Sequence, residues 1–221
     1  MADTTASAAS AAAPPDGTSR ALLDAAHDLL GREGPAALTV RRIATAAGMS
    51  TMNVYSRFGG KDGVLDRLFI DGFERLGVAI DEVETTADPV DDLRRCGEAY
   101  HRFARRWPTY YSLMFDRVVP EYRPSDTALV TSLATLRRLV ARVERAIEAG
   151  AFAPGDPFTI ACGLWALQHG IVSLEARTVD EVGGDHAERH RAAGESFDWA
   201  ATAALTVDAT LDGLRSSPAA G

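Results

Sequence analysis

The stretch Thr39–Phe58, with the sequence TVRRIATAAGMSTMNVYSRF, decides the fold of the first part of this 221-residue chain. Thr39 can cap a short helix with one apolar face, and Gly48 supplies the left-handed turn that follows it. Ser50 can cap a second short helix. The core between the two helices is expected to contain Ile43, Ala47, Met49, Val54 and Phe58. This layout predicts a helix-turn-helix.

The outer side of the second of these helices is the candidate reading surface. When Val54 and Phe58 point inward, the opposite side of the helix is free to meet a major groove of DNA. The residues on or beside that side are Thr51, Met52, Asn53, Tyr55, Ser56 and Arg57. Met52 suits a thymine methyl group and Asn53 suits adenine, although single outward residues on short helices commonly tolerate substitution.

Residues at the helix starts are candidates for contact with the phosphate backbone. Thr39 and Ser50 either only cap their helices or also bind phosphate oxygens through hydroxyl and free N–H groups. Arg41 and Arg42 are either phosphate contacts or solvated surface charges. Lys61 is the only lysine in the chain and follows two glycines, so we expect its flexible ammonium group to reach the DNA backbone.

The charge distribution is compatible with a nucleic-acid partner, although the whole chain has a net charge of −8. Residues 18–63 contain six basic and four acidic groups, whereas residues 64–221 contain 17 basic and 25 acidic groups. A mildly basic head on an acidic body binds phosphates locally while the body stays in solution. Apolar residues make up 46% of the chain and charged residues 24%, as is usual for a globular protein.

Helical periodicity extends over the rest of the chain and predicts an all-α fold. Thr18 or Ser19 can cap a helix that ends at Gly31, and a long helix is expected from Lys61 to about Glu84. Further helices are expected near residues 90–106, 108–116, 126–149, 157–177 and 195–214.

The expected organisation has two domains and two flexible ends. Residues 1–17 are predicted to be a disordered N-terminal arm, and residues 18–63 a helix-turn-helix DNA-binding domain. A larger helical domain for ligand binding and dimerisation is expected over residues 64–215, followed by a flexible tail over residues 216–221.

The N-terminal motif resembles the TetR/AcrR family of repressors over the segment from Arg20 to Asp66. The residues that carry the resemblance are Leu38–Ala44, Ala47–Ser50, Val54-Tyr55, Phe58, Lys61-Asp62 and Leu65. The resemblance implies a three-helix DNA-binding domain, a fourth helix that links it to an effector domain, and a dimer that reads a palindromic operator in double-stranded DNA. The chain departs from the family at Arg57, where histidine is common, and at Gly59-Gly60.

A second resemblance lies in the segment 164–175, LWALQHGIVSLE, which is similar to the Trp/His-Gly C-terminal domain of one branch of that family. Gln168 stands where that branch usually has an aromatic residue. The resemblance implies that the helices near 157–177 and 195–214 form the interface of a homodimer.

A group of mostly aromatic residues is the candidate pocket for a small-molecule effector. It consists of Phe103, Trp107, Tyr110, Tyr111, Met114, Phe115, Trp165 and His169. These side chains either line a mostly apolar cavity or fill the core, and His169 fits a hydrogen-bonded core histidine better than a ligand contact. The function expected from both domains is a ligand-responsive repressor released by a small hydrophobic or amphipathic effector, and the alternative is a constitutive DNA-binding protein or an activator.

Signals of other protein classes are absent from the sequence. It has no Gly-rich phosphate loop, nucleophile elbow or metal-spaced cysteine set, so neither an enzyme nor a cofactor is expected. His186 and His190 have the spacing of a metal pair but lie in a polar, Gly-rich segment that reads as a surface loop. Cys96 and Cys162 are expected to be buried thiols. The sequence shows no signal peptide and no apolar run of about 18 residues, so we expect a cytoplasmic protein with no membrane partner.

Overall fold

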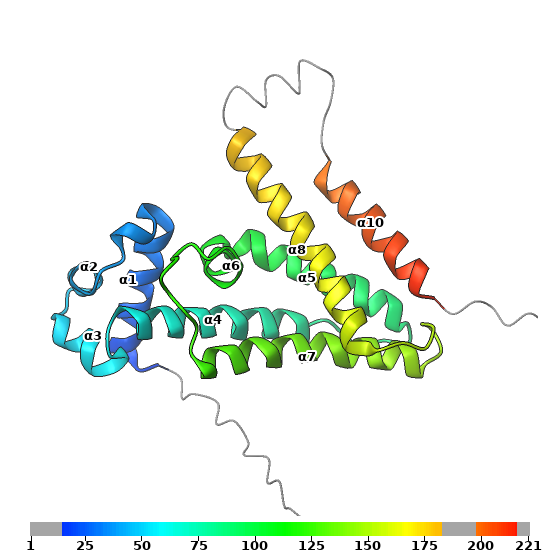
Figure 1. Ribbon diagram of the computed structural model, residues 1–221, viewed down its shortest axis with the longest axis horizontal. Helices are drawn as coiled ribbons and strands as arrows, with labels where there is room; N and C mark the ends of the chain where they lie inside the picture. The colour runs from blue at the N-terminus through cyan, green and yellow to red at the C-terminus, as the bar shows by residue number, and fades with distance from the viewer. Residues whose placement is uncertain (1–14, 183–197, 216–221) are drawn as a thin grey trace, which may run out of the picture. The chain divides into compact units, whose positions relative to one another are not determined.

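The computed structural model describes residues 15–182 and 198–215, with side chains described up to residue 176 and again from residue 198. The chain divides into two compact units, Met1–Leu65 and Asp66–Gly221. Their described parts are helical apart from turns and one isolated bridge between Phe152 and Arg215, which confirms the all-α prediction (Figure 1). The arm up to residue 14, the tail from residue 216, and His186 and His190 lie outside the described residues.

The first unit packs three helices around a small apolar core. They are α1 (Gly17–Glu33), α2 (Val40–Ala46) and α3 (Thr51–Phe58), and a single 3₁₀ turn, η1 (Pro35–Ala37), joins α1 to α2. Helix α1 contacts both α2 and α3, as the shared face of a helix-turn-helix requires. The largest fully buried side chains of this unit are Leu22, Leu23, Leu38, Ile43, Val54, Val64 and Leu65.

Local hydrogen bonds set the ends of these helices. Asp16 caps α1 by accepting a 2.7 Å hydrogen bond from the Ser19 amide, so the helix begins ahead of the cap expected at Thr18 or Ser19. Thr39 caps α2 by accepting from the Arg42 amide at 3.3 Å. Gly48 has a φ of 66°, so the turn between α2 and α3 uses the left-handed conformation that glycine adopts without strain.

Helix α4 (Lys61–Asp81) begins in the first unit and continues into the second, and it ends ahead of the end expected at Glu84. The second unit continues with helices that start at prolines, α5 (Pro89–Arg106), α6 (Pro108–Phe115) and α8 (Pro157–Val182). Proline suits the first turn of a helix because its missing N–H has no partner there. Helices α7 (Asp126–Glu148) and α10 (Trp199–Leu214) instead begin after capping side chains, Ser125 and Asp198. Helix α8 runs past the expected end at residue 177.

The core of the second unit lies where α8 packs against α7, α5 and α10. It is built from buried apolar residues of all four helices, including Leu93, Val143, Ala161 and Leu211. Figure 1 shows α10 running beside α8, and these two helices are in contact. The amide of Ala153 donates a 2.9 Å hydrogen bond to the carbonyl of Leu214, which ties the end of α10 to the loop before α8.

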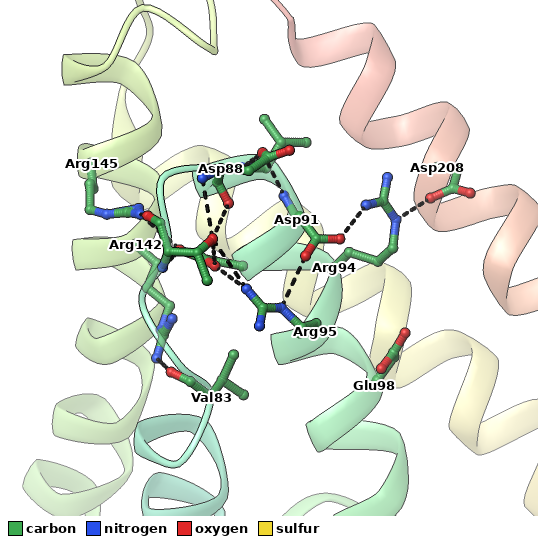
Figure 2. A network of polar contacts seen from close by, with 12 residues as sticks. Val83, Asp88, Asp91, Arg94, Arg95, Glu98, Arg142, Arg145 and Asp208 are labelled. Atoms are coloured by element: carbon green, nitrogen blue, oxygen red, sulfur yellow. Dashed lines mark hydrogen bonds and ion pairs between the residues drawn. The ribbon is translucent and has the colours of Figure 1, made fainter.

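A network of ion pairs fixes the connection between α4 and α5 (Figure 2). Asp92 is 1% exposed and accepts hydrogen bonds from the Thr86 amide (2.9 Å) and hydroxyl (2.8 Å). Arg145 of α7 donates to the same carboxylate at 2.8 Å, and Arg95 of α5 also donates to it. Burial opposes the ionised form, but these donors and cations outweigh it and lower the pKa of Asp92.

The end of α4 is held by a second arginine of α7. Arg142 donates to the carbonyls of Ile80 at 2.9 Å and Val83 at 2.7 Å, at and just beyond the end of α4. Figure 2 shows the contact with Val83. Arg138 pairs with Asp81 at the last residue of α4. The C-terminal end of α4 is therefore fixed to α7.

Helix α8 differs from expectation in its hydropathy. Its segment Pro157–Ala176 is long and apolar enough to cross a membrane by length and composition, although no such run was expected from the sequence. That criterion alone does not separate a membrane span from a helix that packs on other helices. Helix α8 packs on α5, α7 and α10, yet little of this apolar segment is buried.

Candidate DNA-binding surface and ligand cavity

Helix α3 has one buried side and one exposed side. Val54 is fully buried, whereas Met52 is 71% exposed and Tyr55 is 55% exposed. Thr51, Ser56 and Arg57 are exposed too, and Asn53 is half-buried beside them. The side chains predicted to reach a major groove therefore lie together on the open side of α3.

Three of these side chains already have local partners, and one of them is Ser56, whose hydroxyl donates a 3.3 Å hydrogen bond to the Asn53 carbonyl. The Asn53 amide donates a 3.3 Å hydrogen bond to the Ser50 hydroxyl, so Ser50 stands at the start of α3 without capping a backbone N–H. The Arg57 guanidinium lies 3.3 Å from the carboxylate of Asp16. The Ser19 amide, and to a smaller extent Arg57, lowers the pKa of this exposed carboxyl. Reasoning from the sequence does not reveal the contact between Arg57 and Asp16, because the partners are far apart along the chain.

The candidate phosphate contacts lie at the starts of α2 and α4. Thr39, Arg41 and Arg42 are exposed at the start of α2, and the Arg42 guanidinium lies 2.6 Å from the carboxylate of Glu33. An exposed pair of this kind contributes little stability, so a phosphate can compete with Glu33 for Arg42. Lys61 is half-buried at the first residue of α4.

A cavity of about 320 Å³ lies inside the second unit. Its walls come from α4, α5, α6, α7, α8 and α10. Helix α4 contributes Phe69, Phe73, Leu76 and Ile80, which recur at helical spacing on one face. The aromatic rings form a continuous group, because Phe115 lies 5.6 Å from Phe73 and 6.0 Å from Trp165, centroid to centroid.

The residues predicted for the effector pocket divide into two groups. Met114, Phe115 and Trp165 line the cavity. The other five, Phe103, Trp107, Tyr110, Tyr111 and His169, do not line it. Phe103 and Tyr110 are buried in the helix packing, and Trp107 lies under the guanidinium of Arg75, 4.6 Å from the ring centroid.

His169 and Tyr111 belong to a buried polar cluster beside the cavity. The Tyr111 hydroxyl lies 2.7 Å from Nδ1 of His169, and the rings are stacked at 5.8 Å. Tyr100, which does line the cavity, lies 3.4 Å from both the Tyr111 hydroxyl and His169 Nδ1. His169 thus has the hydrogen-bonded position that the sequence favoured for it.

Several cavity residues were missed by reasoning from the sequence. The stripe of α4 was visible as apolar periodicity in the expected helix 61–84, but the sequence does not show that this face borders a cavity. Gln168 was noted only as a departure from a family pattern, and it lines the cavity in direct contact with Gly97.

Comparisons with known proteins place this chain in a family. Residues 93–204 match the family described as "Tetracyclin repressor-like, C-terminal domain", which covers more than half of the chain, and residues 22–68 match "Bacterial regulatory proteins, tetR family". The chain belongs to the TetR family. This confirms the resemblance drawn from the helix-turn-helix, and the protein is therefore a DNA-binding transcription regulator.

Solved structures share the fold of this TetR family regulator at low sequence identity. A protein of unknown function from Rhodococcus sp. RHA1 has a TM-score of 0.75 and 23% identity, covering 93% of this chain and 99% of its own. The fatty acid degradation regulator FadR from Bacillus halodurans has a TM-score of 0.67 and 17% identity, covering 92% and 100%. AibR, solved with isovaleryl coenzyme A and operator DNA, has a TM-score of 0.57 and 20% identity, covering 71% and 86%. The search of curated proteins gives no match.

Proposed function

We propose that this TetR family regulator is a cytoplasmic homodimeric repressor that binds a palindromic operator and leaves it when a small apolar effector enters the cavity. The observation that carries the proposal is the open side of α3, where Met52 and Tyr55 are exposed while Val54 is fully buried. Large apolar and aromatic side chains are exposed in this way at binding surfaces. The family membership of the first unit points to DNA as the partner.

Exposed apolar residues of α8 and α10 support dimerisation through these helices. Phe158 is 45% exposed, Leu174 is 55% exposed and Leu205 of α10 is 73% exposed. Small residues between them, such as Ala166 and Ala201, are exposed too. A second copy packed on this face would cover the apolar segment of α8, and a two-fold axis would make the operator palindromic.

Helix α4 supports a route from the cavity to the DNA-binding unit. Its first residues lie in that unit, its aromatic stripe lines the cavity, and its last residues are fixed to α7 by Arg142. An effector that presses on Phe69 or Phe73 would therefore displace the beginning of α4, and with it the first unit in which Val64 and Leu65 are buried, more than the end fixed to α7. In the DNA-competent dimer the two α3 helices would be about 34–36 Å apart, one turn of the duplex. AibR, solved in complex with isovaleryl coenzyme A and operator DNA, supports the presence of both a ligand site and a DNA site in a protein of this fold.

The test is selection of DNA from a randomised duplex pool by the purified full-length protein at low salt. Recovery of a palindromic site, together with loss of binding in Tyr55→Ala and an intermediate effect in Tyr55→Phe, would support the proposal. Tyr55 is 55% exposed, so both variants should melt at the temperature of the unaltered protein. Failure to retain any duplex, or full binding by Tyr55→Ala combined with Lys61→Ala, would overturn it.

A constitutive DNA-binding protein is the second candidate, and the cavity of about 320 Å³ argues against it. A constitutive regulator would show neither a rise in melting temperature nor release of DNA when hydrophobic compounds are added. Repression and activation are separated by reporter assays with the recovered site, because loss of the protein raises transcription only in the first case.

A further inference from the structure

The wall of the cavity carries no formal charge. Within the described part of the chain, the residues that line it include neither an acidic nor a basic side chain. Most are aliphatic or aromatic, and the members with a polar atom are Cys96, Tyr100, Ser132, Thr135, Trp165 and Gln168. Burial raises the pKa of Cys96 to about 11 and raises the pKa of Tyr100 as well, so both are neutral at pH 7.

Most of the hydroxyl groups in the wall are already committed to neighbours. Ser132 donates to the Leu129 carbonyl at 2.8 Å, and Thr135 lies 3.2 Å from the carbonyls of Phe73 and Thr131. Tyr100 belongs to the cluster with Tyr111 and His169. The protons of Ser132 and Thr135 are therefore in use, so these two hydroxyls can accept a hydrogen bond from a ligand but not donate one.

Unlike these hydroxyls, the side-chain amide of Gln168 has both a hydrogen-bond donor and an acceptor that are not used by a neighbour. Its amide makes no hydrogen bond to another residue in the described ranges, although it is half-buried and borders the cavity. The side chain lies against Gly97, where an added Cβ would come within 2.2 Å of its Nε2 atom. Glycine at this position of α5 thus leaves the room that the amide occupies.

We propose that the effector is an uncharged, largely apolar molecule with one hydrogen-bonding group that pairs with the amide of Gln168. The inference rests on the proposed function only in taking this cavity as the effector site. The cavity is partly open to solvent at Leu133 and Trp165, but a carboxylate, phosphate or ammonium group held against its wall would lose part of its water without meeting a counter-charge, which disfavours binding of an ion. The amide both donates and accepts, so an alcohol, ketone, ester or lactone satisfies it. The acyl coenzyme A bound by AibR carries phosphates, so this chain is expected to select a different class of ligand.

The test uses four probes with one phenylalkyl body, added to the full-length protein without DNA. They are butylbenzene, benzylacetone, phenylbutyrate and phenylbutylammonium, and binding is measured by calorimetry and by tryptophan fluorescence, since Trp165 lies in the wall. The affinity for benzylacetone is expected to be at least about tenfold higher than the affinity for either ion. Binding of either ion as tight as that of benzylacetone, or no binding of either neutral probe, would overturn the proposal.

Two variants test the role of the amide. Gln168→Leu keeps the size of the side chain, so it should weaken benzylacetone by about 3- to 10-fold and leave butylbenzene unchanged. Gln168→Glu adds a carboxylate of the same shape and should strengthen phenylbutylammonium relative to the unaltered protein. The melting temperatures of both proteins show whether they are folded. If both are folded and bind benzylacetone with equal affinity, the pairing with Gln168 is refuted.

Failure of this proposal and failure of the proposed function are separable. If the protein retains no DNA but binds benzylacetone as expected, only the regulatory function fails. If it binds a selected operator and an ion is the preferred probe, only the ligand class fails.

Discussion

Replacement of Asp92 by asparagine tests the network that fixes the connection between α4 and α5. The variant keeps the shape of the side chain but removes the charge shared by Arg95 and Arg145, and it turns an NH₂ group toward donors. Removing one partner of a buried ion pair costs about 3–5 kcal/mol. The two guanidinium groups are 30% and 32% exposed, so water recovers part of that loss. We therefore expect a destabilisation of about 3 kcal/mol, which lowers Tm by about 6–12 °C in a chain of this length.

Thermal unfolding followed by circular dichroism measures this effect, and its pH dependence identifies the cause. Because the pKa of Asp92 is lowered in the folded protein, its contribution is present above the ordinary carboxyl pKa and is lost as the pH falls. The gap in Tm between the unaltered protein and Asp92→Asn should thus close in acid. Asp212→Asn is the matched control, because Asp212 is 65% exposed in its pair with Arg215 and should cost less than about 1 kcal/mol. A loss in Asp92→Asn no larger than in the control, or a gap that persists in acid, would refute the reasoning.

Two further predictions concern DNA binding and assembly. Lys61→Ala should reduce the slope of log K against log salt by about 1 while the preferred sequence stays the same, because a phosphate contact releases counterions without reading bases. Arg32→Ala is the control, because it removes an equal charge from the exposed end of α1 and should leave the slope unchanged. If Lys61→Ala and Arg32→Ala change the slope equally, Lys61 makes no specific phosphate contact. If the proposed dimer forms through α8 and α10, Leu205→Glu should convert it to a monomer in sedimentation, because the charge would be buried in the apolar interface that covers this side chain, which is 73% exposed in the single chain. Leu129→Glu on α7, where the side chain is 51% exposed, should remain dimeric, and a dimer in both variants would place the interface elsewhere.

Most of the helices could be predicted from the sequence because strong local signals mark their ends. Pro89, Pro108 and Pro157 occupy first turns, and Gly48 adopts the left-handed conformation that its turn needs. The end of α8 was misplaced, because the Thr178 region read as a break and helix α8 continues through it to Val182. The start of α1 was misplaced because the acidic residue before Gly17 caps it ahead of the hydroxyl residues.

The candidate sites were less predictable, because a site depends on which faces of distant helices meet. On helix α6, Met114 and Phe115 line the cavity, whereas Tyr110 is buried elsewhere between the helices. Because all three are close along the chain, the sequence alone does not show which of them face the cavity. The apolar stripe that contains Phe69 and Phe73 was not singled out for the same reason. The open side of α3 was more accessible to prediction, since one short helix with Val54 inward fixes the direction of its neighbours.

The exposed side of α3 and the apolar helices α8 and α10 belong to different compact units, and this separation has a genetic consequence. In the proposed homodimer, a subunit with Tyr55→Ala still presents an intact α8 and α10. When made together with unaltered chains, it would sequester them in mixed pairs that have one competent reading head. Loss-of-function alleles in the head should therefore be dominant over the wild-type gene, whereas alleles such as Leu205→Glu that abolish pairing should be recessive.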